Sequence, residues 1–192
     1  MRGPAKVLEM ANLRRLQIHI RYQRHALRNR VMVLLSFKAG MRAAEIAGLE
    51  WTMVLTPEGR LAKHVSIADR IAKNRSGRRV PVSPELRVAL EALRREQRYI
   101  RAGPVIRSQR GAHMTARGVV NWFAKTYRDV GMPGCSSHSG RRTFITRAAR
   151  LLTKSGGSLR DVQELAGHRS LTTTERYIEG DREAQHRLIR LI

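Results

Sequence analysis

The sequence predicts a mixed α+β domain that is mainly α-helical and contains one small antiparallel β-sheet. Most apolar residues recur at helical spacing between glycine, proline and serine stop signals. One central stretch instead shows short β-type runs separated by two turn segments. A length of 192 residues suits one domain. We therefore expect that domain over residues 25–180, after a basic lead-in over residues 1–24.

The first strong helical pattern covers His25–Ala39, where leucine and valine recur every three or four positions. Gly40 follows it as a stop signal. Ala43–Leu49 reads as a second, short helix. The lead-in is only loosely periodic and has room for one short helix.

The central stretch predicts the small sheet. Trp51–Leu55 and Leu61–Ile67 read as strands joined by the turn Thr56–Gly59. A second turn, Lys73–Gly77, leads to the β-type run Arg79–Val82. Together these segments suggest an antiparallel sheet with a basic tip.

Hydroxyl side chains mark the starts of two further helices. Ser83 is placed to cap a helix whose first residue is Pro84. Thr115 caps a helix that runs to about Val130. A third helix begins near Ser137 and carries a buried stripe that includes Ile145 and Leu151. The remaining predicted helices are Leu159–Ala166, Leu171–Ile178 and an amphipathic helix over residues 181–192.

The charge of the chain favours a polyanion as its partner. There are 38 Lys and Arg residues against 15 acidic ones, which gives a formal charge of +23. Nucleic acid is the first candidate, because phosphate neutralisation releases counterions and rewards many basic side chains. No apolar run approaches the roughly 18 residues of a membrane span. We expect a cytoplasmic protein without an intrachain disulfide, since Cys135 is the single cysteine.

The C-terminal third holds side chains suited to chemistry on an anion. His138 and Arg141 are three residues apart at a predicted helix start, where free backbone N–H groups favour an anion. His168 follows Gly167, and Tyr177 comes nine positions later. Taken singly, these residues also fit plain structural roles as a helix cap, a helix terminator or a core tyrosine. Their order and spacing favour one phosphate-binding site.

Two upstream residues complete the set. Arg42 stands at the start of a helix, where Glu45, one turn later, would buttress it, and Lys73 begins the basic turn. With them the sequence resembles the tyrosine recombinase, or phage integrase, family. The family signature is an Arg, a hairpin Lys, His-x-x-Arg, Gly-His and a Tyr nine residues later. The matching residues are Arg42, Lys73, His138, Arg141, His168 and Tyr177.

The resemblance implies a role for each of these residues. Arg42 and Arg141 would clamp the phosphate, and Lys73 would act as general acid. The two histidines would bind phosphate and transfer protons. Tyr177 would attack the phosphodiester and hold the DNA 3′-phosphate covalently. No cofactor and no metal are expected, because no zinc-binding spacing accompanies the histidines and Cys135.

Other basic side chains are candidates for contacts with the DNA backbone, with an ordinary solvated surface as the alternative. Some lie on the predicted hairpin and the others on the helix after Thr115. The candidates are Arg75, Arg78, Arg79, Arg117 and Lys125.

The chain departs from the family pattern in three places. Position 140 is Gly where the family commonly has Leu, and position 142 is Arg where it commonly has His. Family members usually carry an N-terminal core-binding domain, where this chain has only about 25 residues. The chain would then be a naturally minimal enzyme, a truncated remnant, or a protein that needs an accessory DNA-binding protein to hold DNA. The helix over residues 181–192 would dock into a neighbouring subunit or pack on its own domain.

The leading interpretation is a site-specific recombinase that cleaves and rejoins double-stranded DNA, with four protomers on two duplexes as the family resemblance implies. Two alternatives stay open. A type IB topoisomerase would use similar chemistry to relax one duplex. A DNA-binding accessory protein, or a decayed integrase remnant, would keep the fold without the activity.

Overall fold

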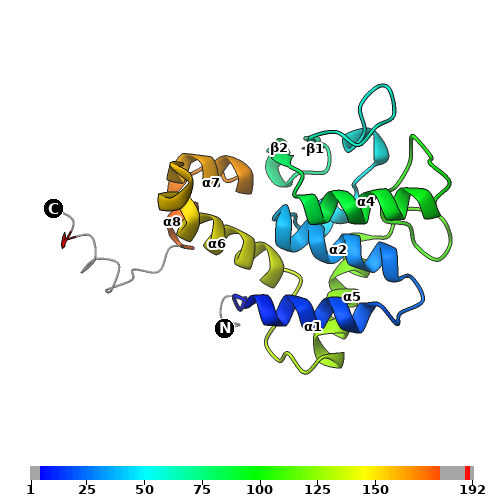
Figure 1. Ribbon diagram of the computed structural model, residues 1–192, viewed down its shortest axis with the longest axis horizontal. Coiled ribbons are helices and arrows are strands. Elements are labelled where there is room, and N and C mark those ends of the chain that lie inside the picture. Colours follow the sequence, from blue (N-terminus) through cyan, green and yellow to red (C-terminus); the bar gives the residue numbers. More distant parts are fainter. Residues whose placement is uncertain (1–4, 178–188, 191–192) are drawn as a thin grey trace.

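The computed structural model describes residues 5–177 and 189–190, and these residues form a mainly helical domain with a two-stranded antiparallel sheet (Figure 1). The predicted fold class is confirmed. No helix in this part of the chain is long and apolar enough to cross a membrane. The helices are α1 (Met10–Ile20), α2 (Ala26–Lys38), α3 (Ala43–Ala47), α4 (Pro84–Glu96), α5 (Ala116–Asp129), α6 (Ser139–Ser155), α7 (Leu159–Ala166) and α8 (Leu171–Glu175). The strands are β1 (His64–Ile67) and β2 (Arg78–Pro81), and the 3₁₀ helices are η1 (Trp51–Met53) and η2 (Lys73–Arg75).

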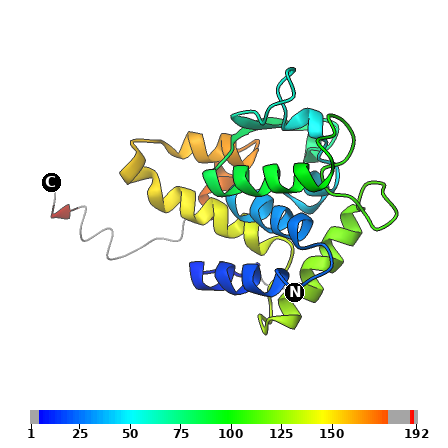
Figure 2. The same ribbon diagram turned by 45° about the vertical axis from the view of Figure 1, so that its right-hand side comes forward.

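Helix α2 lies at the centre of the main hydrophobic core. It contacts α1, α3, α4 and α6, and Figure 2 shows it between α4 above and α1 below. The run from Val31 to Leu35 is fully buried, so the middle of this helix is apolar on all sides. Helix α1 falls within the predicted lead-in and buries Leu13, Leu16 and Ile20 in the same core. Part of the lead-in is therefore packed structure.

Two predicted helix caps are confirmed. Ser83 Oγ accepts a hydrogen bond from the Leu86 N–H at 3.3 Å, and Thr115 Oγ1 accepts one from the Gly118 N–H at 3.0 Å. Each bond satisfies a backbone donor that the first helical turn leaves free. Helices α4 and α5 begin at the next residue in each case.

The sheet is smaller than predicted. Strands β1 and β2 pair antiparallel, with Val65 opposite Val80. The predicted strand Trp51–Leu55 is wrong, because its first three residues form η1. The Trp51 indole is fully buried, and its Nε1 donates to Gln97 Oε1 at 3.0 Å. This contact anchors the start of the segment to the end of α4, and only its last residue, Leu55, forms an isolated antiparallel bridge, to Leu61.

A smaller apolar cluster joins α6, α7 and Tyr177 beside the main body (Figure 1). Ile145 is buried there, as predicted, but Leu151 is 48% exposed, because the apolar stripe is wider than the surface packed against it. Helix α6 also packs closely on α2 at Gly140, where an added Cβ would clash with the Phe37 ring. The helix predicted over residues 181–192 lies almost entirely outside the described residues.

Candidate active site

Six side chains from five segments are among those that line one cavity of about 1010 Å³. The segments are the α2–α3 junction, η2, the N-terminus of α6, the α7–α8 turn and the residues that follow α8. All the residues predicted from the sequence to carry the chemistry are in the cavity wall. They are Arg42, Lys73, His138, Arg141, His168 and Tyr177.

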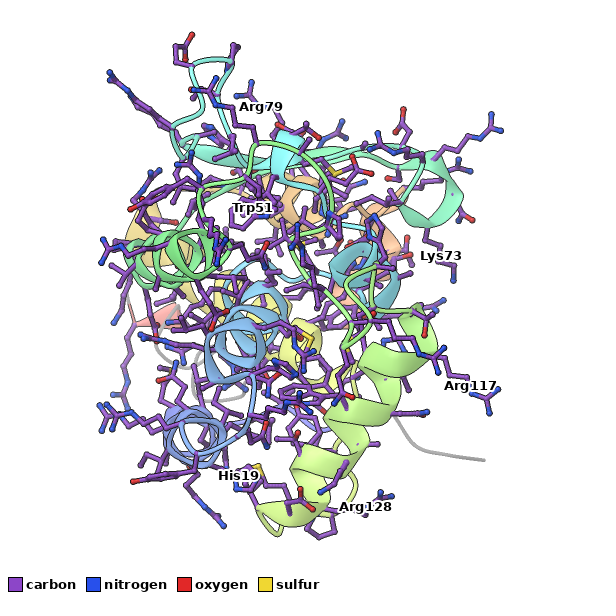
Figure 3. The ribbon with its side chains drawn as sticks, turned by 90° about the vertical axis from the view of Figure 1, so that its right-hand side faces the viewer. His19, Trp51, Lys73, Arg79, Arg117 and Arg128 are labelled. Carbon is purple, nitrogen blue, oxygen red and sulfur yellow. The ribbon has the colours of Figure 1, made fainter. Side chains whose placement is uncertain are left out.

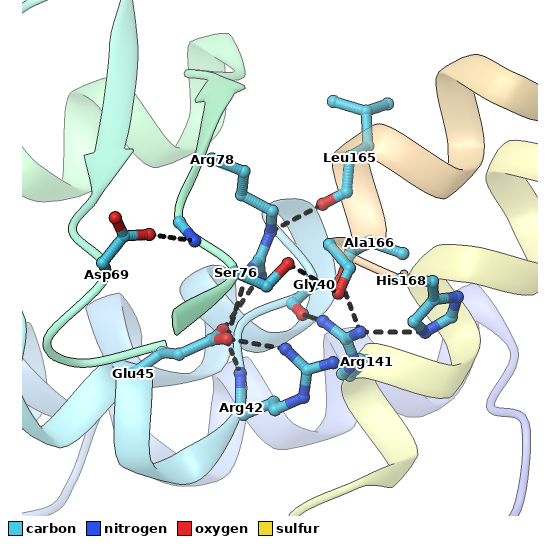
Figure 4. Close-up of polar contacts among 12 residues, drawn as sticks. Gly40, Arg42, Glu45, Asp69, Ser76, Arg78, Arg141, Leu165, Ala166 and His168 are labelled. Carbon is cyan, nitrogen blue, oxygen red and sulfur yellow. Dashed lines mark hydrogen bonds and ion pairs between the residues drawn. The ribbon is translucent and has the colours of Figure 1, made fainter. Parts of the chain in front are cut away.

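Glu45 is the buried anion at the base of the site (Figure 4). Its Oε1 accepts from Arg42 Nη1 at 2.7 Å and its Oε2 from the Arg42 N–H at 2.9 Å, which confirms the predicted buttress. Arg78 Nη1 and Nη2 donate to the two carboxylate oxygens at 3.0 and 2.9 Å. Burial alone would raise the pKa of Glu45. The hydrogen bonds and charges of Arg78 and Arg42 outweigh burial and lower that pKa to about 2.

Arg78, which was predicted as a DNA contact on the hairpin, belongs to the interior of the site. Its side chain is only 5% exposed, and its Nε donates to Leu165 O at 2.8 Å. The buried carboxylate of Glu45 draws this arginine inward from the hairpin. Gly167, at φ +61°, leaves room for it, because an added Cβ would lie 2.9 Å from Arg78 Cδ. A side chain at position 167, just before His168, would therefore collide with Arg78.

The Arg141 guanidinium is fixed at the floor of the cavity. Nη1 donates to Gly40 O at 2.6 Å, and Nη2 donates to Ala166 O at 2.5 Å and lies 3.1 Å from His168 Nε2 (Figure 4). These bonds use three of its five N–H groups, and no described residue accepts from the other two. Burial, then the neighbouring guanidinium groups, lower the pKa of Arg141 to about 9. It stays cationic at neutral pH and keeps donors for an anion.

His168 is held in one neutral tautomer. Because a guanidinium only donates, Nε2 accepts from Arg141 and the ring proton lies on Nδ1. Nδ1 is 3.0 Å from Thr174 Oγ1, which accepts that proton. Burial, followed by the charges of the nearby arginines, lowers the pKa of His168 from 6.5 to about 4. The imidazole is therefore uncharged at neutral pH.

Tyr177 lies just beyond α8 and not inside a helix as predicted, since α8 ends at Glu175. Its backbone N–H donates to Thr174 O at 3.0 Å. The phenol ring stacks on the His168 imidazole, with ring centroids 5.5 Å apart and 27° between the planes. Arg142 Cζ lies 5.6 Å from the centre of the same phenol ring. The candidate nucleophile thus lines the cavity of its own chain.

His138 and Lys73 are the exposed members of the set. His138 is the N-cap of α6, so this helix starts slightly later than the predicted Ser137. Figure 3 shows Lys73 at the outer edge of the molecule. The next two residues, Asn74 and Arg75, have φ of 59° and 52°, a region that residues other than glycine rarely adopt. Lys73 therefore precedes an unusual backbone turn.

The remaining predicted DNA contacts are exposed side chains. Arg75 and Arg79 lie on the hairpin and Arg117 on α5. Figure 3 shows Arg117 and Lys73 pointing to the same side of the view, with Arg79 apart from both. Lys125 makes a surface ion pair of 2.7 Å along α5, which partly compensates its charge. These four contacts stay predictions.

Lys6 and Arg142 line the cavity but were not among the predicted site residues. Lys6 precedes Leu8, whose N–H donates to Thr143 Oγ1 at 2.9 Å and ties the N-terminal segment to α6. No local pattern indicates such a contact. One feature of the sequence indicates that Arg142 belongs to the site, namely a second positive charge directly beside Arg141.

The arrangement suits chemistry on a phosphodiester. The guanidinium groups of Arg42 and Arg141 can donate to the oxygens of a tetrahedral anion. A phenol and an ammonium group in the same cavity offer a nucleophile and a proton donor. Within the described residues, no three His, Cys, Asp or Glu side chains are grouped to share a metal ion.

Comparisons with known proteins identify relatives of the chain. The family model described as the phage integrase family matches residues 6–184. Tyrosine recombinase XerC of Brucella suis biovar 1 is 30% identical over 155 residues, which cover 79% of this chain and 46% of that protein. XerC of Xylella fastidiosa is 31% identical over 159 residues, which cover 81% and 49%. The chain thus spans about half the length of these curated relatives.

Solved structures share the fold. The Tn1549 transposon integrase, in complex with transposon right end DNA, has a TM-score of 0.74 at 20% identity, over 98% of this chain and 67% of that chain. The XerA recombinase has a TM-score of 0.73 at 18% identity, over 100% of this chain and 64% of that chain. At these identities the likeness shows the fold alone. Because the family model matches nearly the whole sequence, the chain belongs to the phage integrase family.

Proposed function

We propose that this chain is a site-specific DNA recombinase, or integrase, that breaks and rejoins DNA strands through a 3′-phosphotyrosyl intermediate. The observation that carries the proposal is the convergence of Arg42, Arg141, His168 and Tyr177 on one cavity. The charge of +23 supports double-stranded DNA as the partner. Solved relatives in complex with DNA, among them XerH bound to difH substrate, support the same partner.

The cleavage step follows from the side chains in the cavity. The scissile phosphate would sit with its non-bridging oxygens between Arg42 and Arg141. Tyr177 Oη attacks phosphorus, so the Oη–P bond forms and the P–O5′ bond breaks. Negative charge develops on the non-bridging oxygens, where guanidinium groups already in place stabilise it without reorganisation. The phenolic proton passes to His138, because His168 Nε2 already accepts from Arg141, and the leaving O5′ takes a proton from Lys73.

Rejoining is the reverse reaction. A 5′-hydroxyl attacks the phosphotyrosine, the new P–O5′ bond forms and Tyr177 is released. The phosphotyrosyl bond retains the energy of the phosphodiester, so ATP is not consumed. Joining strands of two duplexes needs four such sites, which supports a homotetramer on DNA with residues 181–192 as the candidate link between subunits. An accessory DNA-binding protein would add phosphate contacts.

Trapping of a covalent adduct tests the proposal. The chain is mixed with a library of random-sequence duplexes, each nicked so that cleavage releases a short fragment and religation is prevented. Adducts that survive SDS are recovered and their DNA is sequenced. We expect adducts at a defined sequence with the intact chain and none with Tyr177→Phe, because phenylalanine lacks the attacking oxygen. Tyr99→Phe, at a half-exposed tyrosine outside the cavity, is the matched control and should keep the adduct.

Two other outcomes would favour the alternatives. Tight DNA binding without any adduct across the library would support an accessory protein or a decayed remnant. An adduct accompanied by relaxation of supercoiled DNA, without joining of two sites, would support a topoisomerase.

A further inference from the structure

Arg142 contacts the phenol ring of Tyr177 from the first turn of α6. Its Cζ lies 5.6 Å from the ring centre, and its side chain lines the same cavity. Adjacent residues of a helix point about 100° apart. Arg141 therefore reaches the cavity floor at Gly40, while Arg142 reaches the tyrosine.

The same face of α6 holds Tyr177 at a second point. Thr146 Oγ1 donates to Tyr177 O at 3.4 Å, and Thr146 is one helical turn from Arg142. The ring also stacks on His168. Because α8 ends before Tyr177, a single backbone bond to Thr174 O ties this residue to the helix and leaves the ring to be held by other contacts. Contacts with α6 and His168, together with packing against the apolar cluster of α6 and α7, hold the phenol in the cavity.

We propose that Arg142 is a positioning residue that keeps the Tyr177 ring in its own chain's cavity through a cation–π contact. The proposal rests on the proposed function, in which Tyr177 is the nucleophile. A guanidinium over an aromatic face attracts the ring through its quadrupole. The ring would leave the attack position more often without this contact, and cleavage would slow. DNA affinity would change little, since the contact is made within the protein.

A competing role for Arg142 is binding of a DNA phosphate, as for Arg141. The two roles differ in what they affect. A phosphate contact contributes to DNA affinity and to its salt dependence. A ring contact contributes to the cleavage rate and to the position of the phenol.

The test compares Arg142→Ala and Arg142→His with Arg150→Ala, an exposed arginine on the same helix. Adduct formation is measured in single turnover on the nicked substrate, and the DNA Kd is measured in a Tyr177→Phe background. We expect adduct formation to fall about 3- to 30-fold in Arg142→Ala, with a Kd change below about 2-fold. Arg150→Ala should change neither. A Kd that rises in step with the loss of cleavage would overturn the proposal in favour of phosphate binding.

A second measurement keeps the inference separate from the proposed function. In NMR spectra of protein with labelled tyrosine and histidine rings, the Tyr177 signals are assigned by their loss in Tyr177→Phe. We expect the nuclear Overhauser contacts between the Tyr177 and His168 rings to weaken in Arg142→Ala and to persist in Arg150→Ala. Unchanged contacts in Arg142→Ala would overturn the proposal. This holds even if the wild-type chain cleaves no DNA, a result that would reject the proposed function alone.

Discussion

Arg141 and His168 share a hydrogen bond that sets the protonation state of the imidazole. Arg141 Nη2 lies 3.1 Å from His168 Nε2, and only the arginine can donate. Protonation of Nε2 would break this bond and place two cations side by side. The site therefore favours neutral His168, in line with a pKa lowered to about 4.

Stability should depend on pH through this histidine. The pKa of His168 is about 4 in the folded chain, below its ordinary value of 6.5. Above pH 6.5 both states are neutral and the group has no effect. As the pH falls from 6.5 towards 4, the unfolded state takes up a proton first, so the free energy of unfolding declines. Urea unfolding of wild type and His168→Gln checks this. The difference in unfolding free energy between wild type and variant should shrink as the pH falls from 6.5 towards 4. A difference in unfolding free energy that does not change with pH would contradict this prediction.

Removal of the Glu45 charge should destabilise the fold. Glu45→Gln leaves Arg42 and Arg78 without their shared buried anion. A pKa lowered from 4.5 to about 2 corresponds to about 3 kcal/mol of unfolding free energy, present above pH 4.5 and lost as the pH falls towards 2. We expect a loss of that order at pH 7 in urea unfolding. Glu50→Gln, which breaks the exposed pair with Arg70, is the control and should cost less than about 1 kcal/mol. Equal losses would contradict the central role of Glu45.

Local signals were sufficient to predict much of the fold and the site. Ser83 and Thr115 act within one helical turn of the ends they cap, so a short window of sequence contains the information. The Arg42–Glu45 contact also spans a single turn. The candidate catalytic residues could be predicted because each of them falls in a short ordered motif, although only the fold shows that they converge on one cavity.

Features that depend on distant contacts could not be predicted in this way. Arg78 is drawn inward by Glu45, 33 positions earlier, so a basic residue on a hairpin proved to be buried. Trp51 pairs with Gln97, 46 positions later, and this anchors a 3₁₀ turn where a strand was expected. The packing of the assembled core decides which side chains are buried. This packing can override the local preference of a segment for a strand.

Arg169 should hold the turn that follows Lys73. Its Nη2 donates to Asn74 O at 2.6 Å, and Asn74 is the first of the two residues of positive φ in this turn. Without this bond the turn would relax and Lys73 would be misplaced as proton donor. We expect Arg169→Ala to slow adduct formation by about 10-fold, a typical share of a general-acid effect.

The leaving group decides whether Arg169 acts through Lys73. In a substrate with a 5′-bridging sulfur, the leaving group is a thiolate, which departs without taking up a proton. Its cleavage should be nearly equal in wild type, Lys73→Ala and Arg169→Ala. Arg160→Ala, at an exposed arginine paired with Glu164, is the matched control. If the sulfur substrate restores the cleavage rate of Lys73→Ala but Arg169→Ala still cleaves it slowly, Arg169 does not act through Lys73.

Lys6 should add one phosphate contact beside the cavity. It lines the cavity wall, and its Cε would lie 2.9 Å from a Cβ at Gly134, so the side chain runs along that segment. The bond from Leu8 to Thr143 fixes the chain two residues later. We expect Lys6→Ala to weaken binding to all duplexes alike and to reduce the slope of log K against log salt by about 1. Lys154→Ala, at the far end of α6, should leave the slope unchanged, and an equal effect of both variants would mean that Lys6 contributes only general charge.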